Sequence, residues 1–248
     1  MINYQSNISS LRSIGAQQSA DYAANQPFPH ISLDNFFYEG VMSEVIAEVD
    51  AVHQAKATGS FLNKRTEHNK YTFEPEDVGV NTNRLVTFLN SGPFLSYIEK
   101  LTGIPNLIAD PSYFGGGLHI IENGGFLEIH ADFNHLKRYN LERRVNLLLY
   151  LNKNWKPEFQ GKLELWDYKS RTLVKDIAPD FNRCVIFSTT RESLHMGIQC
   201  RSCVLLINPG DLSHFTTTRT PGNQRFKTHA TLSIIYPQVI TQREEHQE

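Results

Sequence analysis

Apolar residues in the first part of the chain recur at helical spacing. In residues 38–57 they lie three or four positions apart, as on one face of an amphipathic helix. They are Val41, Val45, Ile46, Val49 and Val52. Residues 81–103 predict a helix, a turn and a second helix that ends at Gly103. Apolar and polar residues alternate in part over residues 28–37, which favours a strand. Residues 1–26 are polar and predict irregular or weakly helical structure.

From about residue 113 the pattern changes to short apolar runs between turn residues, which is typical of β-strands. The sequence GGLHIIENGGFLEIHADF is interrupted by Asn123, Gly124 and Gly125, a hairpin-like signal. Further strands are predicted in residues 143–152, 162–168, 171–177, 182–189, 201–208 and 229–237. Helices followed by many strands predict an α+β chain with one antiparallel β core supported by N-terminal helices.

Composition and charge limit the classes of function. Hydrophobic residues make up 40% and charged residues 20% of the 248 residues, as in globular domains. Lys and Arg number 24 against 26 Asp and Glu, so no excess charge favours nucleic acid or an anionic membrane as partner. No signal-like or membrane-spanning segment stands out, and three cysteines suit a reducing compartment. We therefore expect a cytoplasmic location.

The stretch FLEIHADFN places His130 and Asp132 two residues apart at the end of an apolar run. Residues i and i+2 of a strand point to the same face, so an imidazole and a carboxylate would lie side by side. Such a pair is two thirds of the 2-His-1-carboxylate triad of non-haem Fe(II) oxygenases. Because the chain has ten histidines, such a pair by itself is more often a polar strand end than a metal site.

The order of motifs after this pair resembles that of 2-oxoglutarate/Fe(II)-dependent dioxygenases of the prolyl 4-hydroxylase-like branch. The matching motifs are the H-x-D pair, YLNKNW, a G-x-L-x-L-W strand, an I-x-P-x-F-x-R strand and FSTTRESLH. The resemblance spans roughly residues 110–237. It implies a double-stranded β-helix (jelly-roll, cupin-like) core within one domain of residues 1–248, with residues 1–109 as mainly helical support.

The resemblance also implies the site residues. The metal ligands would be His130, Asp132 and His195, with His214 as the competing distal histidine. A cation on the strand after the distal histidine would pair with the second carboxylate of 2-oxoglutarate. Arg225 and Lys227 are both eligible because they share one face of that strand.

Tyr150 matches a family tyrosine that hydrogen-bonds the same carboxylate, and a half-buried aromatic on a barrel strand is the equal alternative. The chain departs from the family in residues 196–224, which intervene between His195 and the basic strand. Either these residues are an inserted strand and loop near the mouth of the barrel, where we expect them to affect substrate selectivity, or the distal histidine is not His195. Cys200 and Cys203 lie inside this segment, and without a second ligand pair they predict ordinary thiols.

The implied activity is hydroxylation of a C–H bond, coupled to decarboxylation of 2-oxoglutarate to succinate and CO2. The implied cofactors and co-substrates are Fe(II), 2-oxoglutarate and O2, with ascorbate as a candidate accessory reductant. An intact Asp132 favours hydroxylation, since related halogenases carry a small residue there. We expect a prolyl residue of a protein or peptide as substrate. A free amino acid or small metabolite is the alternative, and a non-catalytic cupin-like metal sensor ranks below both.

Overall fold

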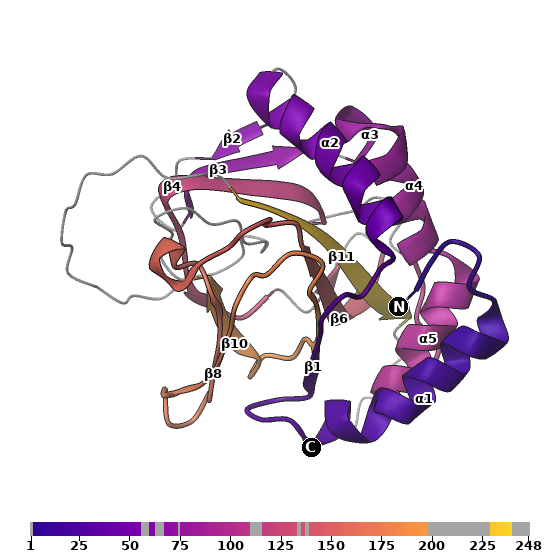
Figure 1. The fold of residues 1–248 in the computed structure, drawn as a ribbon. Coiled ribbons are helices and arrows are strands. Elements are labelled where there is room, and N and C mark those ends of the chain that lie inside the picture. The colour runs from indigo at the N-terminus through magenta and orange to yellow at the C-terminus, as the bar shows by residue number, and fades with distance from the viewer. Residues whose placement is uncertain are drawn as a thin grey trace.

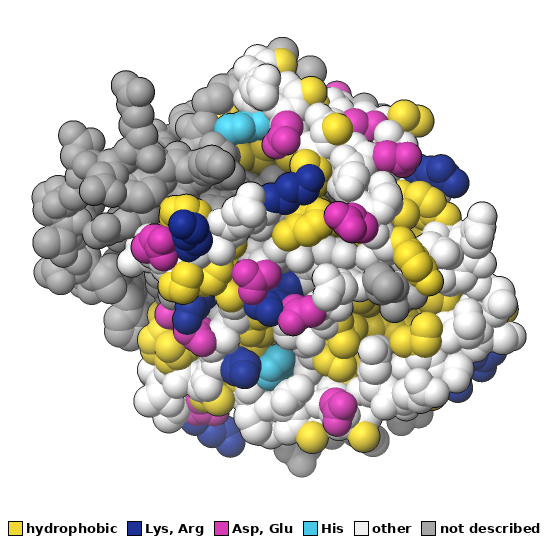
Figure 2. All heavy atoms as spheres, in the orientation of Figure 1, with side chains coloured by type: hydrophobic (Ala, Val, Ile, Leu, Met, Phe, Trp, Pro, Cys, Tyr) yellow, Lys and Arg dark blue, Asp and Glu magenta, His cyan; other side chains and the backbone are white. Residues whose placement is uncertain are grey.

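A computed structural model describes residues 2–55, 60–62, 67–73, 75–109, 116–132, 135–136, 139–197 and 229–239. Within these ranges, no helix is both long enough and apolar enough to cross a membrane. Helices gather on one side of a large, curved antiparallel sheet (Figure 1). On the face seen in Figure 2, acidic and basic side chains lie interspersed, as the near balance of charges leads one to expect. The α+β arrangement predicted from the sequence is thus confirmed.

The N-terminal segment forms a regular helix, α1 (Ile8–Ala24), where the sequence predicted irregular or weakly helical structure. Its N-cap Asn7 accepts a hydrogen bond from the backbone N–H of Ser10 at 2.9 Å, which satisfies one of the free donors of the first turn. The helix packs closely on α5, because a Cβ added at Gly15 would lie 2.5 Å from the carbonyl oxygen of Tyr97. Its stability therefore depends on a distant partner, which local sequence does not reveal.

The other two helical predictions are confirmed. The prediction for residues 38–57 matches α2 (Glu39–Ala55), and that for residues 81–103 matches α4 (Val80–Leu89) and α5 (Gly92–Thr102). Gly103 ends α5 in the left-handed conformation, with φ of 72°, which glycine adopts without steric cost. The described residues also include two short helical elements, α3 (Pro75–Val78) and the 3-10 helix η1 (Pro157–Phe159).

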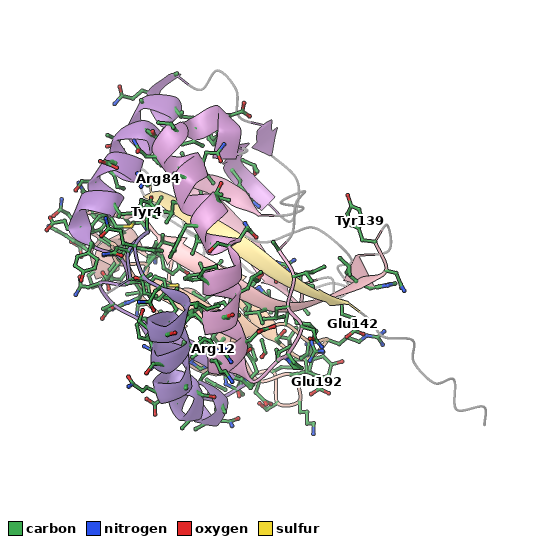
Figure 3. All side chains as sticks on the ribbon, turned by 90° about the vertical axis from the view of Figure 1, so that its right-hand side faces the viewer. Tyr4, Arg12, Arg84, Tyr139, Glu142 and Glu192 are labelled. Carbon is green, nitrogen blue, oxygen red and sulfur yellow. The ribbon has the colours of Figure 1, made fainter. Side chains whose placement is uncertain are left out.

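The N-terminal residues also contact α4 directly. The guanidinium of Arg84 lies 4.3 Å from the centre of the Tyr4 ring, a cation–π contact (Figure 3). The aromatic rings of Phe36, Phe88 and Phe94 continue this contact region between the helices. The helices therefore form one packed layer against the sheet.

The described strands form a single sheet with the order β1-β9-β6-β11-β4-β10-β7-β8, to which β3 with β2 and the short β5 are added through β4 and β6. All of these strand pairs are antiparallel. The strands are β1 (His30–Leu33), β2 (Ser60–Leu62), β3 (Glu67–Phe73), β4 (Gly117–His130), β5 (His135–Leu136), β6 (Leu141–Tyr150), β7 (Leu163–Trp166), β8 (Leu173–Ile177), β9 (Cys184–Ser188), β10 (Leu194–Gly197) and β11 (His229–Val239).

The predicted hairpin at Asn123–Gly125 is wrong. Strand β4 runs continuously from Gly117 to His130, and β3 pairs with it on both sides of this segment. The register shifts between the pairs His68–Phe126 and Lys70–Ile121, so the additional residues of β4 are accommodated as a bulge. The glycines allow a local irregularity without reversing the chain. Strands β2 and β3 were not predicted, and the predicted strand 201–208 lies outside the described residues.

The central strand β6 is buried on both faces from Val145 to Tyr150. Side chains alternate along a strand, so Leu147 and Leu149 lie on one face and Asn146 and Tyr150 on the other. A single apolar cluster joins the helices to the sheet and includes Leu147 and Leu149. Asn146 donates a hydrogen bond to Asp132, so the face of β6 that carries Asn146 and Tyr150 looks toward the inside of the curved sheet, where the candidate site lies.

Candidate metal centre

Two histidines meet on adjacent strands inside the sheet. His130 is the last residue of β4 and lies directly opposite His195 on β10, with ring centres 4.8 Å apart. Asp132 follows two residues after His130 and reaches the same point. Its Oδ1 lies 3.8 Å from His130 Nε2, and its Oδ2 lies 3.5 Å from His195 Nε2. One ligand atom from each residue falls within 4.8 Å of the other two.

His195 is held in the tautomer that a metal requires. Its Nδ1 donates a hydrogen bond to the carbonyl of Ser193 at 2.9 Å, because a carbonyl oxygen only accepts. The neutral ring then carries its lone pair on Nε2, which is fully buried and has no hydrogen-bond partner among the described residues. Burial lowers the pKa of His195, although the Asp132 charge opposes this, and the imidazole stays neutral. The Phe187 ring packs edge-on against it at 4.9 Å.

Asp132 is ionised in spite of complete burial. Burial raises the pKa of its carboxyl, but the charge of Arg143, the two histidines and a hydrogen bond from Asn146 together lower it. Arg143 Nη2 lies 3.2 Å from Asp132 Oδ2, and Asn146 Nδ2 donates to the same oxygen at 2.6 Å. The carboxylate therefore carries its charge at the site without needing a solvent contact.

This donor set fits a divalent transition metal. Two imidazoles and one carboxylate converge within the separation that a single ion can span, and the buried Nε2 of His195 makes no hydrogen bond to any described residue. Three protein ligands of this kind leave coordination positions for small molecules, as in non-haem Fe(II) oxygenases. The cluster is therefore a candidate iron site, with His130, Asp132 and His195 as the groups that could hold it.

The structure brings together the three residues that the sequence assigned to the metal. The competing His214 and the basic residues Arg225 and Lys227 lie outside the described residues. Tyr150 is fully buried on β6, opposite Thr231 of β11, and shares the inner face with Asn146. This position is compatible with the predicted contact to 2-oxoglutarate, which stays a prediction.

Two cations on the inner face were not predicted from the sequence. Arg143 is 1% exposed and contacts Asp132. Lys70 of β3 is also 1% exposed and lies opposite Ile121 of β4, two positions from the pair Thr72–His119. A lysine is rarely buried this deeply without an interaction. Burial lowers the pKa of His119 well below its usual value, and the nearby Lys70 charge adds to this effect.

Comparison with known proteins agrees with this geometry. Residues 116–205 match the family model of the 2OG-Fe(II) oxygenase superfamily. A comparison of this chain with curated proteins found no significant match. A prolyl hydroxylase from Trichoplax adhaerens, solved with a hypoxia inducible factor oxygen degradation domain peptide, is 15% identical with a TM-score of 0.62, and 95% of each chain is covered.

Two further solved structures share the fold. A prolyl-4-hydroxylase from Pseudomonas putida is 14% identical with a TM-score of 0.59, covering 91% of this chain and 99% of that one. HygX from Streptomyces hygroscopicus, solved with nickel and 2-oxoglutarate, is 11% identical with a TM-score of 0.52, covering 90% and 86%. At such identities the likeness shows the fold, whereas the chemistry rests on the family match and the triad. Residues 116–205, which carry His130, Asp132 and His195, thus match the 2OG-Fe(II) oxygenase superfamily, and the chain shares its fold with prolyl hydroxylases.

Proposed function

We propose that this protein is an Fe(II)- and 2-oxoglutarate-dependent dioxygenase and that it hydroxylates a prolyl residue in a protein or peptide. The buried His-Asp-His cluster carries the proposal, because it fits an iron that leaves positions for 2-oxoglutarate and O2. Likeness over nearly the whole chain to two prolyl hydroxylases supports the choice of substrate. The carboxylate at Asp132 supports hydroxylation, since an anionic ligand occupies the position that a halide would otherwise need.

Three side chains would hold the iron: His130 and His195 through an imidazole nitrogen and Asp132 through a carboxylate oxygen. Fe(II) with 2-oxoglutarate supplies the oxidising power, in which one atom of O2 enters succinate and the other enters the substrate. The protein holds the ligands and excludes water. The Ser193 carbonyl fixes the His195 ring, and Phe187 packs against it, so the donor atoms keep their positions before any metal binds.

We further propose that the described strands belong to a double-stranded β-helix and that 2-oxoglutarate lies along its inner face. Tyr150 would donate its hydroxyl to the second carboxylate, and Arg225 or Lys227 would supply the opposite charge. Support comes from the register of β11, where Thr231 lies between Tyr150 on β6 and His119 on β4. Arg225 and Lys227 precede this strand closely in the sequence.

Substrate-stimulated turnover tests the proposal. The protein with Fe(II), 2-oxoglutarate and O2 is incubated with proline-containing peptides, free amino acids or small metabolites, and succinate and product mass are measured. We expect peptides to stimulate succinate formation and to gain one oxygen on proline. Matched peptides with alanine in place of proline serve as controls. Stimulation by a free amino acid or metabolite alone would reject the prolyl substrate and keep the dioxygenase chemistry.

A further inference from the structure

Two buried side chains of β6, Asn146 and Arg143, contact one oxygen of Asp132, the proposed carboxylate ligand. Asn146 Nδ2 donates to Asp132 Oδ2 at 2.6 Å, and Arg143 Nη2 contacts the same oxygen at 3.2 Å. The pair is also joined internally, since Arg143 Nη2 donates to Asn146 Oδ1 at 2.6 Å. All three side chains are at most 2% exposed. The short contacts thus form a closed triangle of one charge pair and two hydrogen bonds.

An irregularity in the backbone of β6 allows Arg143 and Asn146 to face the same site. Residues three apart in a regular strand point to opposite faces, so Arg143 and Asn146 could not both face the metal site. The register of β6 against β11 shifts at this point: Tyr236 pairs with Val145, but the next residue, Pro237, pairs with Arg143. One extra residue on β6 therefore makes a β-bulge, which reverses the alternation and re-aims the Arg143 side chain.

The extra residue, Arg144, behaves as a bulge residue. Its side chain is 36% exposed, while its carbonyl accepts a hydrogen bond from the backbone N–H of Thr189 at 2.9 Å. Pro237 has no N–H to donate, and proline within a sheet is tolerated at bulges and edges.

Both contacts fall on the same carboxylate oxygen, and this decides how the carboxylate is oriented. Oδ2 receives the amide and guanidinium donors and also lies 3.5 Å from His195 Nε2, whereas Oδ1 lies 3.8 Å from His130 Nε2. A carboxylate free to rotate about its last torsion would present either oxygen, or both, to an ion. Two fixed donors on Oδ2 hold it in one orientation before the metal binds.

We propose that Asn146 and Arg143 are positioning residues that hold Asp132 for binding of the metal through a single oxygen. They act through Asp132 and touch neither metal nor substrate. The inference rests on the proposed role of Asp132 as a ligand. Metal affinity and ligand geometry, and not only protein stability, should therefore depend on the amide of Asn146. Mutation of a residue that hydrogen-bonds a metal ligand typically lowers metal affinity by roughly 10- to 100-fold.

Binding of Co(II) to the intact protein tests this without turnover. The dissociation constant and the visible ligand-field spectrum are measured for wild type, Asn146→Leu and Arg143→Met, at a temperature where each is folded. We expect roughly 10- to 100-fold weaker binding and a changed spectrum for Asn146→Leu. The matched control is Asn152→Leu, which removes another buried amide that donates to the Pro179 carbonyl at 2.7 Å, away from the site. It should lower the melting temperature and leave Co(II) binding unchanged.

A double-mutant cycle separates positioning from a general structural effect. In an Asp132→Ala background, Asn146→Leu should not change the residual Co(II) affinity further, since its target is absent. Wild-type affinity and spectrum in Asn146→Leu, or an equal loss in the Asp132→Ala background, would overturn the proposal even if Arg143→Met does not fold. A wild type that binds no Co(II) would reject the metal role of Asp132 itself, and the inference with it.

Discussion

The substitution Glu48→Gln tests how the N-terminus of α4 is stabilised. The N-cap residue, Gly79, has no side chain to accept hydrogen bonds from the first turn. The carboxylate of Glu48, on α2, replaces that cap. It accepts from the backbone N–H and side-chain amide of Asn81 at 2.8 and 3.0 Å, and from the backbone N–H and hydroxyl of Thr82 at 2.8 and 2.8 Å.

The expected magnitude follows from these four contacts. A glutamine places an NH2 where one oxygen accepted, so two hydrogen bonds are lost and the negative charge at the helix N-terminus disappears. Hydrogen bonds to charged groups contribute about 1.5–3 kcal/mol each, and partial exposure of Glu48 favours the lower value, which gives about 2–3 kcal/mol. With an unfolding entropy of roughly 2 cal/mol/K per residue, the melting temperature should fall by about 5 °C.

The stability lost in Glu48→Gln should decrease as the pH falls. Burial of Glu48 raises the pKa of its carboxyl, but the hydrogen bonds from Asn81 and Thr82 outweigh burial and lower it. A group with a depressed folded-state pKa stabilises the protein above its unfolded value of about 4.3 and loses this contribution as pH falls through the folded value. The difference between wild type and Glu48→Gln should therefore be full at pH 7 and shrink below about pH 4.3.

Thermal unfolding followed by circular dichroism checks both points, with Glu44→Gln on the exposed face of the same helix as the control for charge alone. A Glu48→Gln melting temperature equal to that of the control at pH 7 would refute the capping role. A difference that persists undiminished at low pH would refute the assignment of the effect to the ionised carboxylate.

The remaining predictions concern close packing and the co-substrate. Gly79→Ala should destabilise by about 1–3 kcal/mol in thermal unfolding, because its Cβ would lie 2.3 Å from the capping carboxylate. Gly40→Ala, with nothing within 4 Å, should have no such cost, and equal losses would contradict the steric reason. Removing the proposed anchor, by Arg225→Gln or Lys227→Gln, should weaken binding of 2-oxoglutarate by roughly 10- to 100-fold. Binding of a keto acid that lacks the second carboxylate should be unchanged. The same selective loss in Lys70→Met alone would place the anchor on β3 instead.

Much of the fold and the proposed metal cluster could be predicted because their signals are local. The apolar stripe of α2 has helical spacing, and the run ending at Tyr150 reads as a buried strand. His130 and Asp132 are close in sequence, so their proximity follows from strand geometry. His195 was placed by the ordered family motifs rather than by spacing, and the structure brings it next to the pair.

The features that the sequence did not reveal depend on distant partners. Helix α1 lacks a strong apolar face and is completed by α5, which approaches within contact of Gly15. Arg143 and Arg144 are adjacent and chemically identical, and only the bulge opposite Pro237 decides which one faces the site. The glycines at 124 and 125 resembled a turn, but pairing with β3 along both halves keeps β4 continuous. In each case tertiary contacts override the local preference.

The most direct test of the iron and 2-oxoglutarate site is the weak visible metal-to-ligand charge-transfer band formed when Fe(II) and 2-oxoglutarate bind without oxygen. It is recorded for wild type, His195→Ala and His214→Ala, with iron binding measured in parallel. The buried triad predicts a band in wild type and in His214→Ala and its loss in His195→Ala. A band that survives in His195→Ala and disappears in His214→Ala would contradict the proposed triad and move the distal ligand.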